Sequence, residues 1–306
     1  MYLELLSVFR YFREYIEAAD GALELKKALD WSVWYAAKWW KEIKEAGVAR
    51  SNAFVKALRE SLYFHGVLDE RGDIKREVKK PELPKGLYAR EWVEMHERLD
   101  QIGAVKIAND EADRNALELL YSDIQVQGWH RIMVKAFLKA VKMPRGLALL
   151  EPYSKEGHLA ALVYEDHTPS LYLGYEPNQS LVEIARYVAP HAKFVAATSA
   201  CDIGGDFDAA LMVEKMQWMP DPAKELECIK KRLREGGVVY VAQPVAESMP
   251  GYLAIMAALG AVHVFTWRQV ESLLKMHFTP ERRLIKTMPF YGAVWKTRPL
   301  GPTQPP

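Results

Sequence analysis

The chain of 306 residues has few cysteines, almost no net charge and no long apolar run. Its two cysteines, Cys201 and Cys228, lie in different expected elements and form no spaced metal cluster, so we expect reduced thiols in a cytoplasmic protein and no metal site. With 41 basic and 40 acidic residues, no overall field draws the protein to nucleic acid. The apolar runs fall short of the roughly 18 residues that a membrane helix needs, so no membrane partner is expected.

Half of the residues are hydrophobic, which allows a sizeable core in one large domain or two ordinary ones. A long helical pattern over 110–142 stops at Pro144 and Gly146. We therefore expect a mainly helical domain over 1–142 and an α/β domain over 143–298. The Pro-rich residues 299–306 are expected to form a disordered tail.

Four apolar segments after this boundary are typical of buried strands, and helical segments lie between them. The strands are expected over 147–151, 171–176, 208–214 and 236–243. The first two end in acids about 25 residues apart, Glu151 and Glu176. Because such alternation builds a parallel sheet that binds ligands at the carboxyl ends of its strands, it predicts a Rossmann-like fold and favours a nucleoside ligand.

The helical half is rich in tryptophan. Trp31, Trp34, Trp39 and Trp40 lie in one amphipathic segment over 22–46. This density fits either core packing or a subunit interface, since aromatic residues are enriched at the centres of interfaces.

Residues 51–78 carry a winged-helix pattern. Ser51 or Asn52 caps a helix, Gly66 ends it, and 67–75 predicts a hairpin. The wing is basic, which favours DNA, but the helix itself presents outward only Lys56 and Arg59 beside Glu60. Nucleic-acid binding is therefore disfavoured. The basic wing residues are Arg71, Lys75, Arg76, Lys79 and Lys80.

Residues 54–73 resemble the winged-helix dimerisation domain of small-molecule O-methyltransferases, and the downstream half resembles class I S-adenosylmethionine-dependent methyltransferases. The second resemblance rests on the order of segments similar to the family's motif I, second, fourth and fifth strands, closing helix and final hairpin. It implies a mostly parallel seven-stranded sheet, S-adenosylmethionine as cofactor, a small-molecule substrate and a homodimer. The segments are 149–160, 172–186, 207–222, 233–241, 266–274 and 290–295.

The same resemblance implies cofactor contacts at the strand ends. Glu176 would accept hydrogen bonds from the ribose hydroxyls, and Glu151 would lie beneath the methionine moiety. Asp202 would contact the adenine amine, with Cys201 or Ser199 as alternatives. The other expected cofactor contacts are Tyr153, Gly157, Pro177 and Glu214.

Two departures from the family pattern stand out. Glycines usually fill the loop after the first strand, where they tolerate positive φ, but Tyr153 and Lys155 replace two of them and only Gly157 remains. Side chains of this size would fill the space of the methionine portion. Lys155 would also place a cation near a sulfonium unless it pairs with the cofactor carboxylate.

The second departure concerns the general base. The family commonly has a histidine after the fourth strand, where this chain has Gln217. An amide orients a substrate but does not deprotonate it at neutral pH. Substitute bases are His130, His158 and His263, each of which also fits a packing or surface role.

Three functions remain open from the sequence. The favoured one is a methyltransferase acting on a small molecule. The second is a protein that keeps the fold without its cofactor and serves as a non-catalytic partner, which Tyr153 and Lys155 favour. The third is a nucleic-acid binder that modifies RNA, which the basic wing weakly favours.

Overall fold

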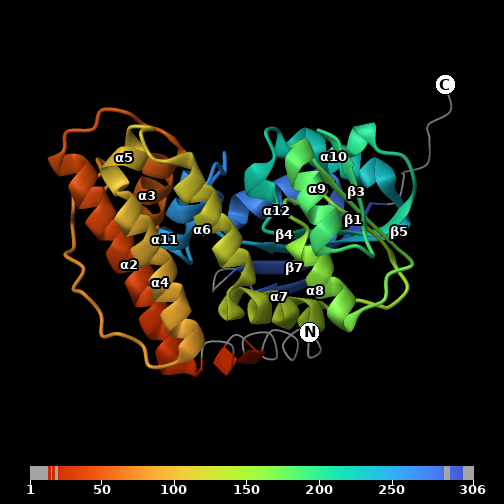
Figure 1. Ribbon diagram of the computed structural model, residues 1–306, viewed down its shortest axis with the longest axis horizontal. Coiled ribbons are helices and arrows are strands. Elements are labelled where there is room, and N and C mark those ends of the chain that lie inside the picture. Colours follow the sequence, from red (N-terminus) through yellow and green to blue (C-terminus); the bar gives the residue numbers. More distant parts are fainter. Residues whose placement is uncertain (1–12, 15, 18–19, 286–289, 299–306) are drawn as a thin grey trace.

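The computed structural model describes residues 13–14, 16–17, 20–285 and 290–298, so the expected tail over 299–306 lies outside the described residues. Helices gather on one side of the molecule, and a sheet covered by further helices forms the other side (Figure 1). Among the described residues, no helix combines the length and the apolar character needed to cross a bilayer.

The helical side is built from successive helices and one that returns from far along the chain. Asn52 caps the second of them, because its side chain accepts a hydrogen bond from the Val55 amide at 3.1 Å. The elements are α2 (Ala22–Glu45), α3 (Ala53–Phe64), α4 (Leu87–Ile102), α5 (Ala104–Ala108), α6 (Arg114–Val126) and α11 (Pro250–Ala258). Helix α11 packs against α2 and α3.

The single helix expected over 110–142 is wrong, because the structure has two. Helix α6 ends before Gln127, whose backbone is extended, and α7 (Gly128–Val141) follows. A Cβ at position 128 would overlap the ring of Tyr88. Glycine at this position therefore allows the close approach of α4 that accompanies the break.

The mostly parallel seven-stranded sheet predicted from the sequence is confirmed. Its order is β3-β2-β1-β4-β5-β7-β6, with β1 to β5 parallel and only β6 and β7 antiparallel. The strands are β1 (Ala148–Glu151), β2 (Leu171–Glu176), β3 (Lys193–Ala196), β4 (Phe207–Val213), β5 (Leu233–Gln243), β6 (Phe278–Ile285) and β7 (Tyr291–Thr297). Its helices are α8 (His158–Asp166), α9 (Gln179–Val188), α10 (Pro222–Arg232) and α12 (Trp267–Lys275), with short η1 (Ala200–Asp202) and η2 (Met216–Trp218).

Most of the tryptophans of α2 belong to the core of the chain. Trp31, Trp39 and Trp40 are buried, and the Trp39 ring lies beside Phe54 and His96. Core packing therefore accounts for these three, while Trp34 is half-buried under the ammonium of Lys80.

The segment after α3 differs from the expected hairpin. One antiparallel bridge joins Leu68 to Ile74, and the Asp69 carboxylate accepts hydrogen bonds from the Arg71 and Asp73 amides. A turn held by an Asp side chain needs no strand ladder. The described residues thus form a one-bridge turn here, and the winged helix stays a prediction.

The expectation of reduced cysteines is wrong. Cys201 of η1 and Cys228 of α10 form a disulfide, with their Cα atoms 4.9 Å apart. The Glu225 carboxylate of α10 also joins α10 to η1, because it accepts a hydrogen bond from the Ala200 amide. The cytoplasmic location rested in part on reduced thiols, and the disulfide removes that support, since disulfides persist mainly in oxidising compartments or in hyperthermophiles.

A buried histidine joins three helices of the helical side. Nδ1 of His96 donates to the Trp92 carbonyl at 2.8 Å, and Nε2 accepts from the Ser32 hydroxyl at 3.1 Å. The Ser32 oxygen in turn accepts from the Gly251 amide at 2.9 Å. Since a Cβ at Gly251 would overlap the His96 ring, the relay requires glycine at this position of α11.

Burial should make His96 a source of acid sensitivity. Burial lowers the pKa of His96 from 6.5 to about 4, so an unfolded chain takes up a proton that the folded one refuses. Folding stability should therefore fall as pH drops from about 6.5 to about 4, by up to about 3 kcal/mol. Urea unfolding of wild type and His96→Asn across this range measures the difference. The exposed His191→Asn variant should keep the wild-type slope, and equal slopes in all three proteins would contradict the assignment.

Candidate functional site

The carboxyl ends of β1 and β4 meet at a buried ion pair. The ammonium of Lys215 lies 2.7 Å from Oε1 of Glu151 and donates to the Tyr153 carbonyl at 3.1 Å. The hydroxyl of Tyr172 donates to the other Glu151 oxygen at 2.8 Å. Burial raises the pKa of Glu151, and Lys215 and Tyr172 act against that rise. Lys215 and Tyr172 thus each contact one oxygen of an acid that is fully shielded from solvent, the Lys215 contact being an ion pair.

The backbone around this pair takes conformations that favour glycine. Tyr153, Lys155 and Glu214 have φ of 48°, 52° and 56°. A left-handed conformation costs a non-glycine residue on the order of 1 kcal/mol or more. The loop after β1 therefore keeps a glycine-like path although it carries large side chains, and such residues cluster where the surrounding contacts determine the geometry.

The acid that ends β2 is used by the protein's own backbone. Glu176 accepts hydrogen bonds from the Lys155 amide at 3.2 Å and from the Asn178 amide at 3.3 Å. Its side chain is buried, with the residue only 3% exposed. The carboxylate expected to hold a ribose thus faces the loop after β1 instead of an open cavity.

The two large loop side chains also have partners within the chain. The Tyr153 hydroxyl donates to the Thr198 carbonyl at 3.3 Å, and burial raises its pKa to about 12. The ammonium of Lys155 lies 4.2 Å from the centre of the Trp218 ring, a cation–π distance. Burial lowers the pKa of Lys155. Both side chains therefore close the loop over the strand ends.

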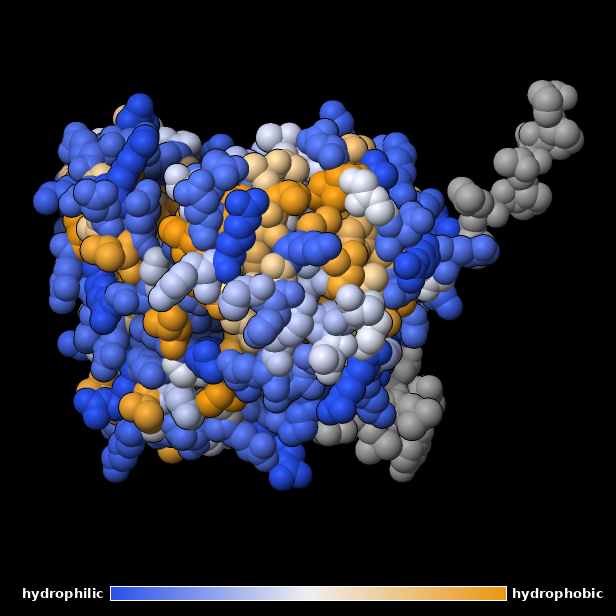
Figure 2. Space-filling view, turned by 45° about the vertical axis from the view of Figure 1, so that its right-hand side comes forward, coloured by the Kyte–Doolittle hydropathy of each residue, from blue (hydrophilic) through white to orange (hydrophobic). Residues whose placement is uncertain are grey.

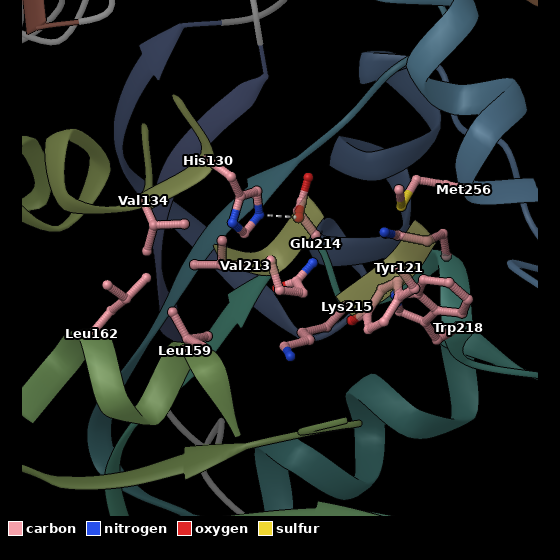
Figure 3. A pocket seen from close by; sticks show the side chains of 12 residues that line it. Tyr121, His130, Val134, Leu159, Leu162, Val213, Glu214, Lys215, Trp218 and Met256 are labelled. Carbon is pink, nitrogen blue, oxygen red and sulfur yellow. Dashed lines mark hydrogen bonds and ion pairs between the residues drawn. The ribbon is translucent and has the colours of Figure 1, made fainter. Parts of the chain in front are cut away.

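On the other side of the β4 end lies a histidine paired with an acid. Nε2 of His130 is 2.9 Å from Oε2 of Glu214, and the Tyr252 hydroxyl donates to Oε1 at 2.6 Å. All three side chains are buried, and they come from α7, the end of β4 and α11. Figure 3 shows His130 and Glu214 facing each other. A carboxylate in this position fixes the orientation of the imidazole ring.

The His130–Glu214 pair borders a small inner cavity of about 20 Å³. This volume holds about one water molecule. Several polar side chains and two aromatic rings line it, and Gln217 contributes a buried amide nitrogen for which the described residues offer no hydrogen-bond partner. The lining includes Tyr121, Gln125, His130, Glu214, Lys215, Gln217 and Trp218.

The structure brings together only some of the residues expected at the site. His130 and Gln217 line the inner cavity, with the Gln217 oxygen accepting from the Gln243 amide. His263 lies outside the cavity lining, with Nε2 at 3.2 Å from the Pro220 carbonyl. Nε2 of His158 lies 3.6 Å from Glu156.

The remaining expected cofactor residues lie around the loop. Gly157 has φ of 78°, and a Cβ there would lie 3.0 Å from Ala185. Asp202 accepts a hydrogen bond from the Thr198 hydroxyl at 3.0 Å and is exposed, as is Pro177. None of these three residues lines the inner cavity.

Sequence reasoning missed Lys215 and Tyr252. Lys215 directly follows Glu214 after β4, and spacing alone does not tell which of two neighbours points toward β1. Tyr252 belongs to α11, which the sequence places almost 40 residues from Glu214 but the fold returns to its side. The one available signal was a lysine directly before the uncharged run Met216–Met219.

No protein-family model and no curated protein sequence matches this chain. Among solved structures, the CurJ carbon methyltransferase is similar with a TM-score of 0.60 at 12% identity, covering 89% of this chain and 91% of that chain. The CMeT domain of the citrinin polyketide synthase has a TM-score of 0.57 at 13% identity, covering 95% of this chain and 97% of that chain. At such identities the likeness shows the fold: this chain has the class I methyltransferase fold, with an arrangement shared over most of its length.

S-adenosylmethionine, the cofactor that this fold implies, does not fit the residues present. The strand-end acids Glu151 and Glu176 are buried and engaged by Lys215 and by backbone amides. The inner cavity of about 20 Å³ is more than tenfold smaller than the roughly 300 Å³ of a small-ligand site. Neither acid lines the larger cleft nearby. The geometry therefore argues against a cofactor in the arrangement described.

Removing Lys215 should lower the stability of the fold, because it leaves a buried acid unpaired. We expect Lys215→Met to lower the free energy of unfolding by about 3–5 kcal/mol, because Glu151 then remains buried without its cation. The double variant Glu151→Gln/Lys215→Met should recover most of that loss, since it buries no unpaired charge. Urea unfolding followed by far-UV circular dichroism measures both. A double variant as unstable as the single one would contradict the ion-pair account.

Proposed function

We propose that this chain is a methyltransferase-fold protein that has lost its cofactor and acts as a non-catalytic binding partner. One observation carries the proposal: the ammonium of Lys215 lies between the Glu151 carboxylate and the Tyr153 carbonyl, where the cofactor is expected. Lys155 adds a second cation, which opposes the approach of a sulfonium. The protein's own groups thus satisfy the acids that a cofactor would use.

Calorimetric titration tests this directly. Wild type should show no binding of S-adenosylmethionine or S-adenosylhomocysteine, because Lys215 and backbone amides already engage both acids. The variant Tyr153→Gly/Lys155→Gly/Lys215→Ala removes all three obstructing side chains, and we expect it to bind S-adenosylhomocysteine with a Kd of roughly micromolar order. The citrinin polyketide synthase CMeT domain is the positive control. Micromolar binding by wild type that disappears in Glu176→Ala would overturn the proposal.

The second candidate is the methyltransferase activity itself, on a small molecule and in the manner of an O-methyltransferase or of the carbon methyltransferases that share the fold. The observation that favours it is the His130–Glu214 pair beside the inner cavity, because an oriented imidazole accepts a proton from a bound substrate. This candidate requires the loop after β1 and Lys215 to take other positions. The same titration decides between the two candidates, since S-adenosylmethionine binding by wild type supports this one alone.

We further propose that residues 1–142 form the module through which two copies pair, with residues 143–298 holding the site. Apolar side chains that are 45–49% exposed gather near the end of α3 and in the turn that follows: Tyr63, Phe64 and Ile74. Exposed aromatic clusters of this kind are enriched at protein interfaces. The α3 helix and its turn also supply the part of the sequence that resembles a winged-helix dimerisation domain.

Light scattering coupled to size exclusion tests the dimer. Wild type should have a measured mass twice that of one chain. The Phe64→Glu variant should have the mass of one chain, because burying a charge at the centre of an interface is costly. Tyr187→Glu, at another exposed aromatic residue on α9, is the matched control and should leave the mass unchanged. A wild-type protein of single-chain mass would refute the proposal.

A further inference from the structure

A large cleft lies between the helical side and the sheet side. Its volume is about 1070 Å³, which is large enough to hold a small organic ligand. Helices α3, α6, α9 and α11 and the loop after β1 all contribute to its lining. The proposed function assigns no ligand to this cleft, and its lining indicates which ligand it would bind.

The walls of the cleft are apolar on two facing helices. Leu117 and Leu119 of α6 and Leu181 and Ile184 of α9 line it. Leu119 is 68% exposed and Ile184 is 44% exposed, which leaves apolar area facing solvent on both helices. Figure 2 shows hydrophobic surface extending across the middle of one face of the molecule. An apolar ligand body would remove such area from water, at about 25 cal/mol per Å².

One end of the cleft carries a cation that the Glu176 and Glu156 carboxylates attract, although neither forms an ion pair with it among the described residues. The ammonium of Lys155 contacts the Trp218 ring, and no hydrogen bond or ion pair to it is found among the described residues. Burial lowers the pKa of Lys155, and attraction to Glu176 and Glu156 acts against that fall. A ligand anion would supply the missing acceptor.

The other charges of the lining favour a single negative charge on the ligand. Glu156 is engaged by the Ser122 hydroxyl, and burial raises the pKa of its carboxyl. Asp110 pairs with Arg50. Arg114 and Glu118 are exposed and opposite in sign. With one compensating ammonium and a carboxyl close by, a dianion such as a phosphate monoester would be repelled where a carboxylate is not.

Aromatic rings separate this cleft from the inner cavity. Tyr121 and Trp218 line both spaces, and their rings meet edge to face with centroids 5.8 Å apart. Because Lys155 lies on the Trp218 face, an anion bound to Lys155 would contact the wall behind which His130 and Glu214 lie. The cleft and the histidine pair are therefore adjacent parts of one region.

We propose that the cleft binds a small molecule with an apolar body and one carboxylate, the carboxylate pairing with Lys155 and the body lying between α6 and α9. The inference rests on the proposed function, since the closed loop after β1 is what places Lys155 against Trp218. It also gives the non-catalytic protein a ligand class, that of medium-chain organic acids.

Calorimetric titration of the full chain with sodium decanoate tests the proposal. Wild type should bind decanoate, whereas decanamide, which has the same body without the charge, and acetate, which has the charge without the body, should bind at least about tenfold more weakly. Lys155→Met should weaken decanoate binding about tenfold and leave decanamide unchanged. Ile184→Asn should weaken both.

Lys231→Met is the matched control, because Lys231 is an exposed lysine on α10 that pairs with Glu227 away from the cleft. It should bind decanoate as wild type does. Absence of decanoate binding, or equal binding by Lys155→Met and wild type, would overturn the proposal. The S-adenosylmethionine titration tests the proposed function separately. If wild type binds neither compound, the cleft proposal is wrong and the proposed cofactor-free function stands. If wild type binds S-adenosylmethionine, the proposed function is wrong, whatever the result with decanoate.

Discussion

The candidate site depends on the buried ion pair between Lys215 and Glu151. Two charges taken out of water carry a large desolvation cost, which is offset here by short contacts to both Glu151 oxygens and by the Tyr153 carbonyl on the ammonium. Because that carbonyl belongs to the loop after β1, the pair also holds the loop in its left-handed backbone path. The directions of Tyr153 and Lys155 follow from this constraint, and with them the closure of the strand ends.

Neighbouring residues at the end of β4 serve two different environments. Lys215 points to β1 and neutralises its acid, while Glu214 points to α7 and α11 and orients His130. The positive φ of Glu214 accompanies this divergence. The imidazole–carboxylate pair therefore lies next to the Lys215–Glu151 ion pair without sharing its partners. The two environments are held by separate contacts, since Lys215 and Glu214 have no partner in common among the contacts described.

The sequence predicted what depends on local pattern. Apolar runs ending in Glu151 and Glu176 predicted two of the parallel strands, and Ser51 or Asn52 predicted the start of α3, where the structure has Asn52. It did not predict the Cys201–Cys228 disulfide, because that contact arises from the packing of η1 on α10 across 27 residues of chain. The break at Gly128 depends on the Tyr88 ring of another helix. Likewise, no spacing rule shows that Lys215 rather than Glu214 faces β1.

Closure of the site is a property of a set of residues rather than of any one substitution. A side chain at a left-handed position costs on the order of 1 kcal/mol, and each here has gained a contact that offsets it: Tyr153 with the Thr198 carbonyl, and Lys155 with Trp218. Glycine at these two positions alone would leave the Lys215 ammonium on Glu151. Removal of Lys215 alone would leave both loop side chains in place and the acid unpaired. Opening the strand ends would therefore require all three side chains to change, because each partial change leaves either the ion pair or the loop side chains in place.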